Sequence, residues 1–167
     1  KGRKCSGNSK MIDCPPGKFQ NDEGKSECID CEHAYLYTDV AGSSVCKVCG
    51  KGSHTNISIT PANDGTGRDE CIECAKGNYC QGDGYSRICQ EGTYQHMIGE
   101  SQCVDCGANN KYSNHDIGVV ECKRCPEGFH TNDSGDSKNM RIECIACKVG
   151  EECRGDGDNI SCDEGKY

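Results

Sequence analysis

Apolar residues are sparse along this chain and rarely occur in runs. Hydrophobic residues make up 33% of the 167 residues, yet 18 of these are cysteine, there is no Trp, and the aromatic rings are those of seven Tyr and two Phe. Without the cysteines roughly a fifth of the chain is apolar, which is too little for the core of an ordinary domain of this length. The 22 glycines, with scattered Asn, Asp and Ser, indicate turns. The pattern therefore predicts a small disulfide-rich fold of short β-hairpins and turns with little helix.

The charge of the chain restricts its partners. The formal net charge is -8 and the pI is about 5.1, whereas a nucleic-acid-binding surface needs a basic face that neutralises phosphates. No apolar run approaches the length of a membrane-spanning helix, and the opening sequence KGRKC is not a signal peptide. We expect no nucleic-acid partner and no membrane insertion within this segment.

The cysteines recur in a pattern of eight with a period of about 74 residues. Units repeated in this way contact mainly their neighbours, so the predicted arrangement is an elongated tandem array. The spacing predicts the end of a preceding repeat, two complete repeats and the start of a following repeat, at residues 1–13, 14–88 (repeat 1), 89–161 (repeat 2) and 162–167.

All eighteen cysteines are candidates for disulfides. Six pairs have CxxC spacing, and the 14 residues between Cys31 and Cys46 would also suit a four-cysteine zinc site. Single cysteines such as Cys14 and Cys80, together with N-glycosylation sequons, favour disulfides on a secretory route. An intracellular zinc protein is the alternative, and a redox-active CxxC is disfavoured because no βαβ pattern surrounds one. The predicted disulfide cysteines are Cys5, Cys14, Cys28, Cys31, Cys46, Cys49, Cys71, Cys74, Cys80, Cys89, Cys103, Cys106, Cys122, Cys125, Cys144, Cys147, Cys153 and Cys162.

Two disulfide schemes fit this spacing, and the sequence does not choose between them. One scheme joins neighbours along the chain and leaves Cys5 and Cys162 to bond outside it; its pairs in repeat 1 are Cys14–Cys28, Cys31–Cys46, Cys49–Cys71 and Cys74–Cys80. The other scheme crosses the CxxC cysteines and closes three short loops, Cys5–Cys14, Cys80–Cys89 and Cys153–Cys162. In either, each ring removes about 2–3 kcal/mol of unfolded-state chain entropy.

Three N-glycosylation sequons begin at Asn56, Asn132 and Asn159. Asn56 and Asn132 occupy the same position in the two repeats, seven residues after Cys49 and Cys125. We expect N-linked glycans at all three asparagines, and those at Asn56 and Asn132 would shield the peptide from proteases. The alternative is that Thr-Asn at these positions serves only as a turn signal.

Glycines and rings recur beside the cysteines. Gly17, Gly92 and Gly165 each follow a cysteine by three residues, where a turn with positive φ or a close backbone approach is expected. An aromatic ring follows each glycine by two residues and is predicted to lie over the adjacent disulfide. These rings belong to Phe19, Tyr94 and Tyr167.

The segments CPPGKFQNDEGKSECIDC and CQEGTYQHMIGESQCVDC resemble the CxxGxY…G…CxxC unit of ephrin-receptor-like cysteine-rich repeats, which are similar in style to tumour-necrosis-factor-receptor and EGF-like modules. The junction CAKGNYCQGDGYSRICQEGTY resembles the junction common in long arrays of such repeats, and units of this length are also similar to those of protist surface antigens. The resemblance implies an extracellular or cell-surface region, and it brings no catalytic residues.

Catalytic and metal-binding residues find little support in the sequence. The five histidines are scattered, and features duplicated in every repeat are usually architectural rather than catalytic. We expect no enzyme and no cofactor. Calcium is a separate possibility, although no EF-hand pattern is present. Its candidate oxygen ligands lie in glycine-rich turns at Asp64, Asp69, Asp83, Asp156 and Asp158.

The segment CRGDGDNISC contains Arg154-Gly155-Asp156, the tripeptide that integrin-type receptors bind. Its counterparts CQGDGYSRIC and CSGNSKMIDC keep the glycine and the following Asp or Asn but not the arginine. We therefore interpret the segment as a recurring turn at the junction between units and not as an adhesion motif.

These patterns predict a non-catalytic extracellular structural region: a glycosylated, disulfide-stapled rod that acts as a spacer, a surface coat or a filament protomer, with neighbouring repeats or its own copies as partners. The alternative is the ectodomain of a cell-surface receptor that binds a protein ligand. A ligand site would break the repetition at one unit, and the most divergent loops are 32–45 and 107–121.

Overall fold

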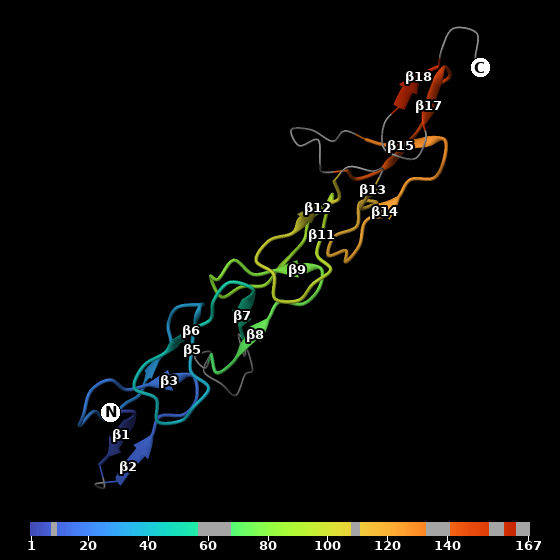
Figure 1. The fold of residues 1–167 in the computed structure, drawn as a ribbon. Helices are drawn as coiled ribbons and strands as arrows, with labels where there is room; N and C mark the ends of the chain where they lie inside the picture. The colour runs from blue at the N-terminus through green and yellow to red at the C-terminus, as the bar shows by residue number, and fades with distance from the viewer. Residues whose placement is uncertain (8–9, 57–67, 108–110, 133–140, 154–158, 163–167) are drawn as a thin grey trace. The chain divides into compact units, whose positions relative to one another are not determined.

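The computed structural model describes residues 1–7, 10–56, 68–107, 111–132, 141–153 and 159–162. Within these ranges the chain forms eighteen short strands, paired into nine antiparallel hairpins, and no helix. The hairpins follow one another in chain order, and each strand pairs only with its sequence neighbour (Figure 1). The predicted fold of short hairpins and turns is confirmed.

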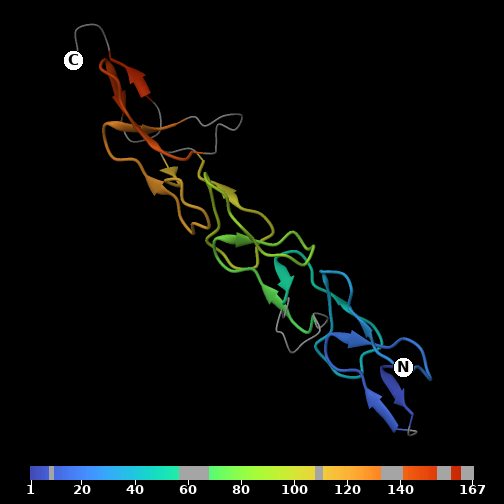
Figure 2. The ribbon, with the colours of Figure 1, turned by 180° about the vertical axis from the view of Figure 1, so that it is seen from behind.

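The chain forms two compact units. Unit 1 comprises residues 1–74, 80–86 and 99–101, and its hairpins are β1 (Arg3–Ser6) with β2 (Lys10–Asp13), β3 (Lys18–Phe19) with β4 (Ile29–Asp30), β5 (Leu36–Tyr37) with β6 (Lys47–Val48), and β7 (Ser53–Thr55) with β8 (Cys71–Glu73). The longest of these pairings joins Arg3 to Asp13 through Ser6 to Lys10, and β1 and β2 lie side by side in both ribbon views (Figures 1 and 2).

Unit 2 comprises residues 75–79, 87–98 and 102–167. Its hairpins are β9 (Asn78–Tyr79) with β10 (Arg87–Ile88), β11 (Thr93–Tyr94) with β12 (Val104–Asp105), β13 (Lys111–Tyr112) with β14 (Lys123–Arg124), β15 (Phe129–Thr131) with β16 (Cys144–Ala146), and β17 (Glu151–Cys153) with β18 (Asn159–Ser161). Along the sequence, segments of the two units alternate between residues 75 and 102. The repeat boundary inferred from cysteine spacing falls between residues 88 and 89, and it stays a sequence-based prediction.

Eight disulfides staple the hairpins, and they follow the scheme that joins neighbouring cysteines. The bonds are Cys14–Cys28, Cys31–Cys46, Cys49–Cys71, Cys74–Cys80, Cys89–Cys103, Cys106–Cys122, Cys125–Cys144 and Cys147–Cys153. The crossed scheme is wrong, because it needs Cys80 bonded to Cys89. The two flanking cysteines, Cys5 and Cys162, form no disulfide in the described residues, as this scheme expects, and their bonding outside the chain stays a prediction.

Cysteine sulfur supplies the interior of this fold. Among the described residues every buried hydrophobic side chain is a cysteine, while apolar side chains such as Val45 and Val48 are about two-thirds exposed. Each ring of about 15–20 residues removes about 3 kcal/mol from the entropy of the unfolded chain, and this constraint replaces the missing core. The remaining buried side chains are polar: Gln20, Thr38, Thr55, Gln95, Ser113 and Thr131.

The two buried glutamines have the same role in each repeat. Gln20 donates from Nε2 to the carbonyl of Glu27 at 2.6 Å, and its Oε1 accepts the N–H of Asp22 at 3.0 Å. Gln95 makes the equivalent bonds, at 2.8 Å to Gln102 and at 3.0 Å from Met97. Each glutamine therefore bridges, from the buried side, the loop of the first hairpin of its repeat, β3–β4 or β11–β12.

Paired glycines bring successive hairpins into backbone contact. Gly52 donates to the carbonyl of Cys80 at 2.9 Å, and Gly99 donates to that of Cys74 at 2.9 Å. A Cβ on Gly52 (φ 80°) would overlap the carbonyl oxygen of Gly99, so only glycine fits. The same arrangement recurs at Gly2 with Gly42 in unit 1 and at Gly77 with Gly118 in unit 2.

The predicted turn glycines behave as expected where they are described. Gly17 and Gly92 have φ of 82° and 77°, in the left-handed region. Phe19 and Tyr94 are half-buried and lie opposite Ile29 and Val104 in their hairpins; packing of the rings on the disulfides stays a prediction. The third copy, Gly165 and Tyr167, lies outside the described residues.

Candidate functional site

The two sequon asparagines that share a repeat position also share a structural position. Each directly follows the first strand, β7 or β15, of the third hairpin of its repeat, β7–β8 or β15–β16. Its side-chain Oδ1 accepts backbone N–H groups from the return segment: Asn56 from Glu70 at 3.0 Å, and Asn132 from Ile142 and Glu143, both at 3.0 Å. Both asparagines are only partly exposed. The side-chain carbonyl therefore faces the backbone of the hairpin and ties the two ends of the intervening loop together.

The amide nitrogens differ between the two asparagines. The Nδ2 of Asn56 donates to Oδ1 of Asp69. In repeat 2 the residue that corresponds to Asp69 is Ile142, which has no carboxylate. An N-linked glycan replaces one hydrogen on Nδ2 and leaves Oδ1 free to accept, so the backbone bonds of both asparagines are compatible with glycosylation. The third sequon residue, Asn159, begins β18 opposite Cys153.

The divergent loops 32–45 and 107–121 both border hollows in the surface. In unit 1 a hollow of about 280 Å³ lies beside the Cys31–Cys46 disulfide, and its lining includes Asp30, Glu32 and His33. Its apolar lining is Phe19, Ile29, Leu36 and Val45. In unit 2 a hollow of about 440 Å³ lies beside the equivalent Cys106–Cys122 disulfide, but its lining includes Lys111 and Glu121. The two repeats thus present different chemistry at one structural position.

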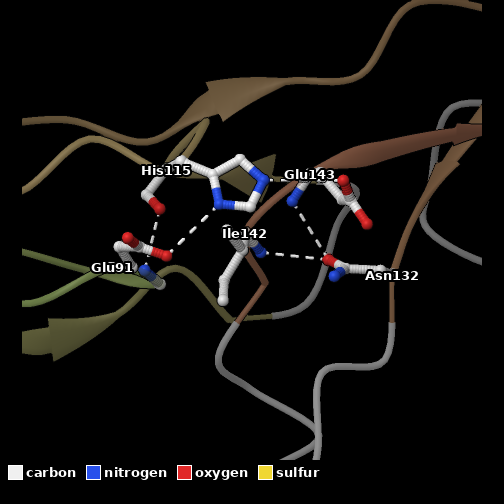
Figure 3. Close-up of polar contacts among 7 residues, drawn as sticks. Glu91, His115, Asn132, Ile142 and Glu143 are labelled. Carbon is white, nitrogen blue, oxygen red and sulfur yellow. Dashed lines mark hydrogen bonds and ion pairs between the residues drawn. The ribbon is translucent and has the colours of Figure 1, made fainter.

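A charged cluster breaks the repetition in unit 2 (Figure 3). His115, in the loop between β13 and β14, places Nδ1 3.3 Å from Oε2 of Glu91 and Nε2 3.5 Å from Oε2 of Glu143. All three side chains are 44–60% exposed. The hydrogen bond to Glu91, followed by that to Glu143, raises the pKa of His115 above its ordinary value of 6.5.

This cluster was missed by the sequence reasoning, which treated His115 as one of five scattered histidines. Two signals were available. The spacing from Cys106 to Cys122 is 16, against 15 from Cys31 to Cys46, so one residue is inserted in this loop. In addition, Glu91 replaces Pro16 of repeat 1. Neither signal fixes a contact without the loop conformation.

The remaining candidate residues are only partly placed. Among the proposed calcium ligands, Asp69 accepts from Asn56 and Asp83 accepts the N–H of Tyr85 at 3.2 Å. The other three, Asp64, Asp156 and Asp158, lie outside the described residues, as do Arg154 and Gly155. The described part of the chain contains no cluster of three or more His, Cys, Asp or Glu side chains suited to a metal ion.

The cysteines do not support the zinc alternative. A zinc site needs thiolates, and sixteen of the cysteines are committed to disulfides.

Within the residues that the structure describes there is no helix of the length and apolarity needed to cross a bilayer.

Comparisons with known proteins agree with the resemblance read from the cysteine spacing. A family model described as tyrosine-protein kinase ephrin type A/B receptor-like matches residues 4–49. The chain is 28% identical over 116 residues to signal peptide, CUB and EGF-like domain-containing protein 2 of Danio rerio, which covers 66% of the chain and 11% of that protein. It is 27% identical over 146 residues to signal peptide, CUB and EGF-like domain-containing protein 3 of Mus musculus, covering 85% of the chain and 14% of that protein.

The chain therefore spans a small part, 11–14%, of the length of these relatives. The predicted resemblance to ephrin-receptor-like and EGF-like modules is confirmed. Together with the disulfides, it identifies the chain as an extracellular type of cysteine-rich module.

Proposed function

We propose that this chain is a non-catalytic spacer region of an extracellular protein, a glycosylated rod whose stiffness comes from disulfides and from glycine-mediated contacts between hairpins. The observation that carries the proposal is the recurrence of one backbone contact at Gly2/Gly42, Gly52/Gly99 and Gly77/Gly118. A contact made by backbone atoms tolerates changes in side chains, so it can be repeated along an array whose surfaces differ. A spacer needs this property, and a surface coat or filament protomer would use it in the same way.

Solution scattering tests the rod. A compact domain of 167 residues has a radius of gyration of about 15 Å. For the oxidised chain with its glycans removed, small-angle X-ray scattering should give a value well above this, with a pair-distance distribution that has a long tail. A radius of gyration near the compact value would overturn the spacer proposal.

Glycosylation is tested separately. After secretion from a eukaryotic cell, enzymatic removal of N-glycans should lower the mass of the chain. The variants Ser58→Ala and Ser134→Ala remove the sequons without touching the asparagines, and each should remove one glycan. An unchanged mass in both variants would leave the asparagines with their structural role alone.

A ligand-binding ectodomain is the second candidate, and the apolar hollow of unit 1 favours it. The equivalent hollow of unit 2 has Lys111 and Glu121 where this one has Leu36 and Val45, and such a difference is the break in repetition that a ligand site predicts. Val45 lines the hollow and is 67% exposed. A screen against extracellular proteins that returned one stoichiometric ligand, lost on Val45→Asp but kept on Val48→Asp, would support the receptor function over the spacer.

A further inference from the structure

We propose that His115, Glu91 and Glu143 form an acid-strengthened clasp that ties together three successive hairpins of repeat 2. Glu91 lies in the turn before β11, His115 in the loop of the β13–β14 hairpin, and Glu143 directly before β16. The imidazole lies between the two carboxylates, and each ring nitrogen faces one of them, at 3.3 and 3.5 Å (Figure 3). One side chain thus links segments 24 and 28 residues away from it.

The clasp adds side-chain contacts to a junction that backbone hydrogen bonds already form. Asn114 donates to the carbonyl of Ile142 at 2.7 Å, and Ser113 donates to that of Arg141 at 3.1 Å. On the other side Gly92 donates to Oγ of Ser113 at 2.8 Å. These bonds hold the loop against both neighbouring hairpins, so the position of the imidazole is set by the fold and not by the ion pairs alone.

The loop conformation is specific to repeat 2. Asn114 and His115 are the only non-glycine residues with positive φ in the described part of the chain, at 60° and 59°. L-residues adopt this conformation at a cost, and Asn is among those that tolerate it best. Counted from the preceding CxxC cysteine, the equivalents in repeat 1 are Asp39 and Val40, and Pro16 stands in place of Glu91. Repeat 1 therefore has the junction without the clasp.

The charged groups around the imidazole favour its cationic form. Glu91 and Glu143 face it from the two neighbouring hairpins. On its own loop, Asp116 lies 3.4 Å from Lys123 and is thereby paired. Arg141, whose charge has the same sign as the imidazolium, accepts the N–H of Ser113 at its carbonyl, and it makes contacts of its own.

The direction of the pH dependence follows from the raised pKa of His115. In the folded chain the imidazolium is favoured, so the contribution of the clasp is fully present below the ordinary histidine pKa of 6.5 and is lost as the pH rises through the folded value. Mildly acidic conditions should therefore tighten this junction, and alkaline conditions should loosen it.

The clasp is linked through Glu143 to the sequon asparagine of repeat 2. The backbone N–H of Glu143 donates to Oδ1 of Asn132, while its carboxylate contacts His115. Glu143 thus connects the clasp to the asparagine that ties the third hairpin.

Nuclear magnetic resonance on the oxidised chain tests the clasp directly. The titration midpoint of the His115 ring should be lower in Glu91→Gln and in Glu143→Gln than in the wild type, and high salt should lower it in the wild type, because exposed pairs are screened. Glu127→Gln, an exposed carboxylate at the start of the third hairpin, is the control and should leave the midpoint unchanged. Equal midpoints in all four proteins would overturn the clasp.

Amide hydrogen exchange separates the clasp from a merely local ion pair. Ser113 and Thr38 donate equivalent bonds, to Arg141 and Arg68, but only Ser113 lies beside the clasp. After correction for intrinsic exchange rates, the protection factor of the Ser113 amide should fall as His115 loses its proton, while that of the Thr38 amide should not change with pH. In His115→Gln the protection factor of the Ser113 amide should not change with pH either. The same pH dependence at both amides, or at Ser113 in His115→Gln, would contradict the proposal.

Discussion

The second hairpins of the two repeats, β5–β6 and β13–β14, share a backbone contact but differ in their loops. In both, the glycine that closes the loop donates to the carbonyl of the first cysteine of the repeat, Gly42 to Cys14 and Gly118 to Cys89, each at 2.8 Å. Between the two cysteines whose disulfide encloses this loop, repeat 2 has one residue more than repeat 1, and its loop carries His115. The comparison teaches that backbone contacts through glycine define the array, while the loops between them are free to acquire chemistry specific to one unit.

Reduction is the strongest way to break what the two repeats share. Both depend on disulfides in place of an apolar core, since the described buried hydrophobic residues are all cysteine. We expect a reducing agent to unfold the whole chain, with loss of amide dispersion in the NMR spectrum and of any thermal transition. A reduced chain that kept a cooperative melt would show that something other than the disulfides holds the hairpins.

Substitution of the contact glycines separates close approach from backbone conformation. Gly52 and Gly128 are repeat equivalents with φ of 80° and 81°, but a Cβ on Gly52 would overlap Gly99, whereas one on Gly128 would meet nothing within 4 Å. An L-residue in this conformation costs about 1–2 kcal/mol. Gly128→Ala should lose about that much stability in chemical denaturation, and Gly52→Ala clearly more. Equal losses would mean that the glycine contact adds nothing to the array.

The cysteine spacing was sufficient to predict much of this architecture. It predicted disulfides, hairpins and the positive φ of Gly17 and Gly92, because a ring closed by few residues leaves little choice of turn. It could not choose the pairing, since Cys80 lies within reach of both Cys74 and Cys89 along the sequence. The choice depends on which hairpin ends meet in space.

The side chains that secure individual loops were harder to predict. Gln20 and Gln95 recur at offset 75 and follow the aromatic ring in both repeats, so a search for recurring polar residues would have found them. His115 has no equivalent in repeat 1, and its contacts depend on two left-handed residues in an inserted loop. No repetition marks such a site, and no local propensity predicts it.

The sequon asparagines sharpen the comparison at the third hairpin. Asn132 accepts two backbone N–H groups across its loop and Asn56 accepts one. In a host without N-glycosylation, Asn132→Ala should lose about 1–3 kcal/mol in chemical denaturation, since both donors lose their acceptor, and Asn56→Ala should lose less. Ser134→Ala, which removes only the sequon, is the matched control. Equal stability of Asn132→Ala and Ser134→Ala would reduce the asparagine to a glycan acceptor.

The smallest effect is expected at Arg154. In the described turn CQGDGYSRIC, Gly82 and Gly84 both have φ of 92°, and a Cβ on Gly84 would overlap the backbone at Ala34. The glycines of this turn serve packing between hairpins, and the exposed Gln81 before them corresponds in sequence to Arg154 and Ser6. Arg154→Gln should therefore leave attachment of integrin-bearing cells to the immobilised chain unchanged. If cells attach to the wild type and no longer attach after this substitution, the segment is an adhesion site specific to repeat 2. Chemistry specific to one repeat would then occur in the turns between repeats as well as in the loop of the second hairpin.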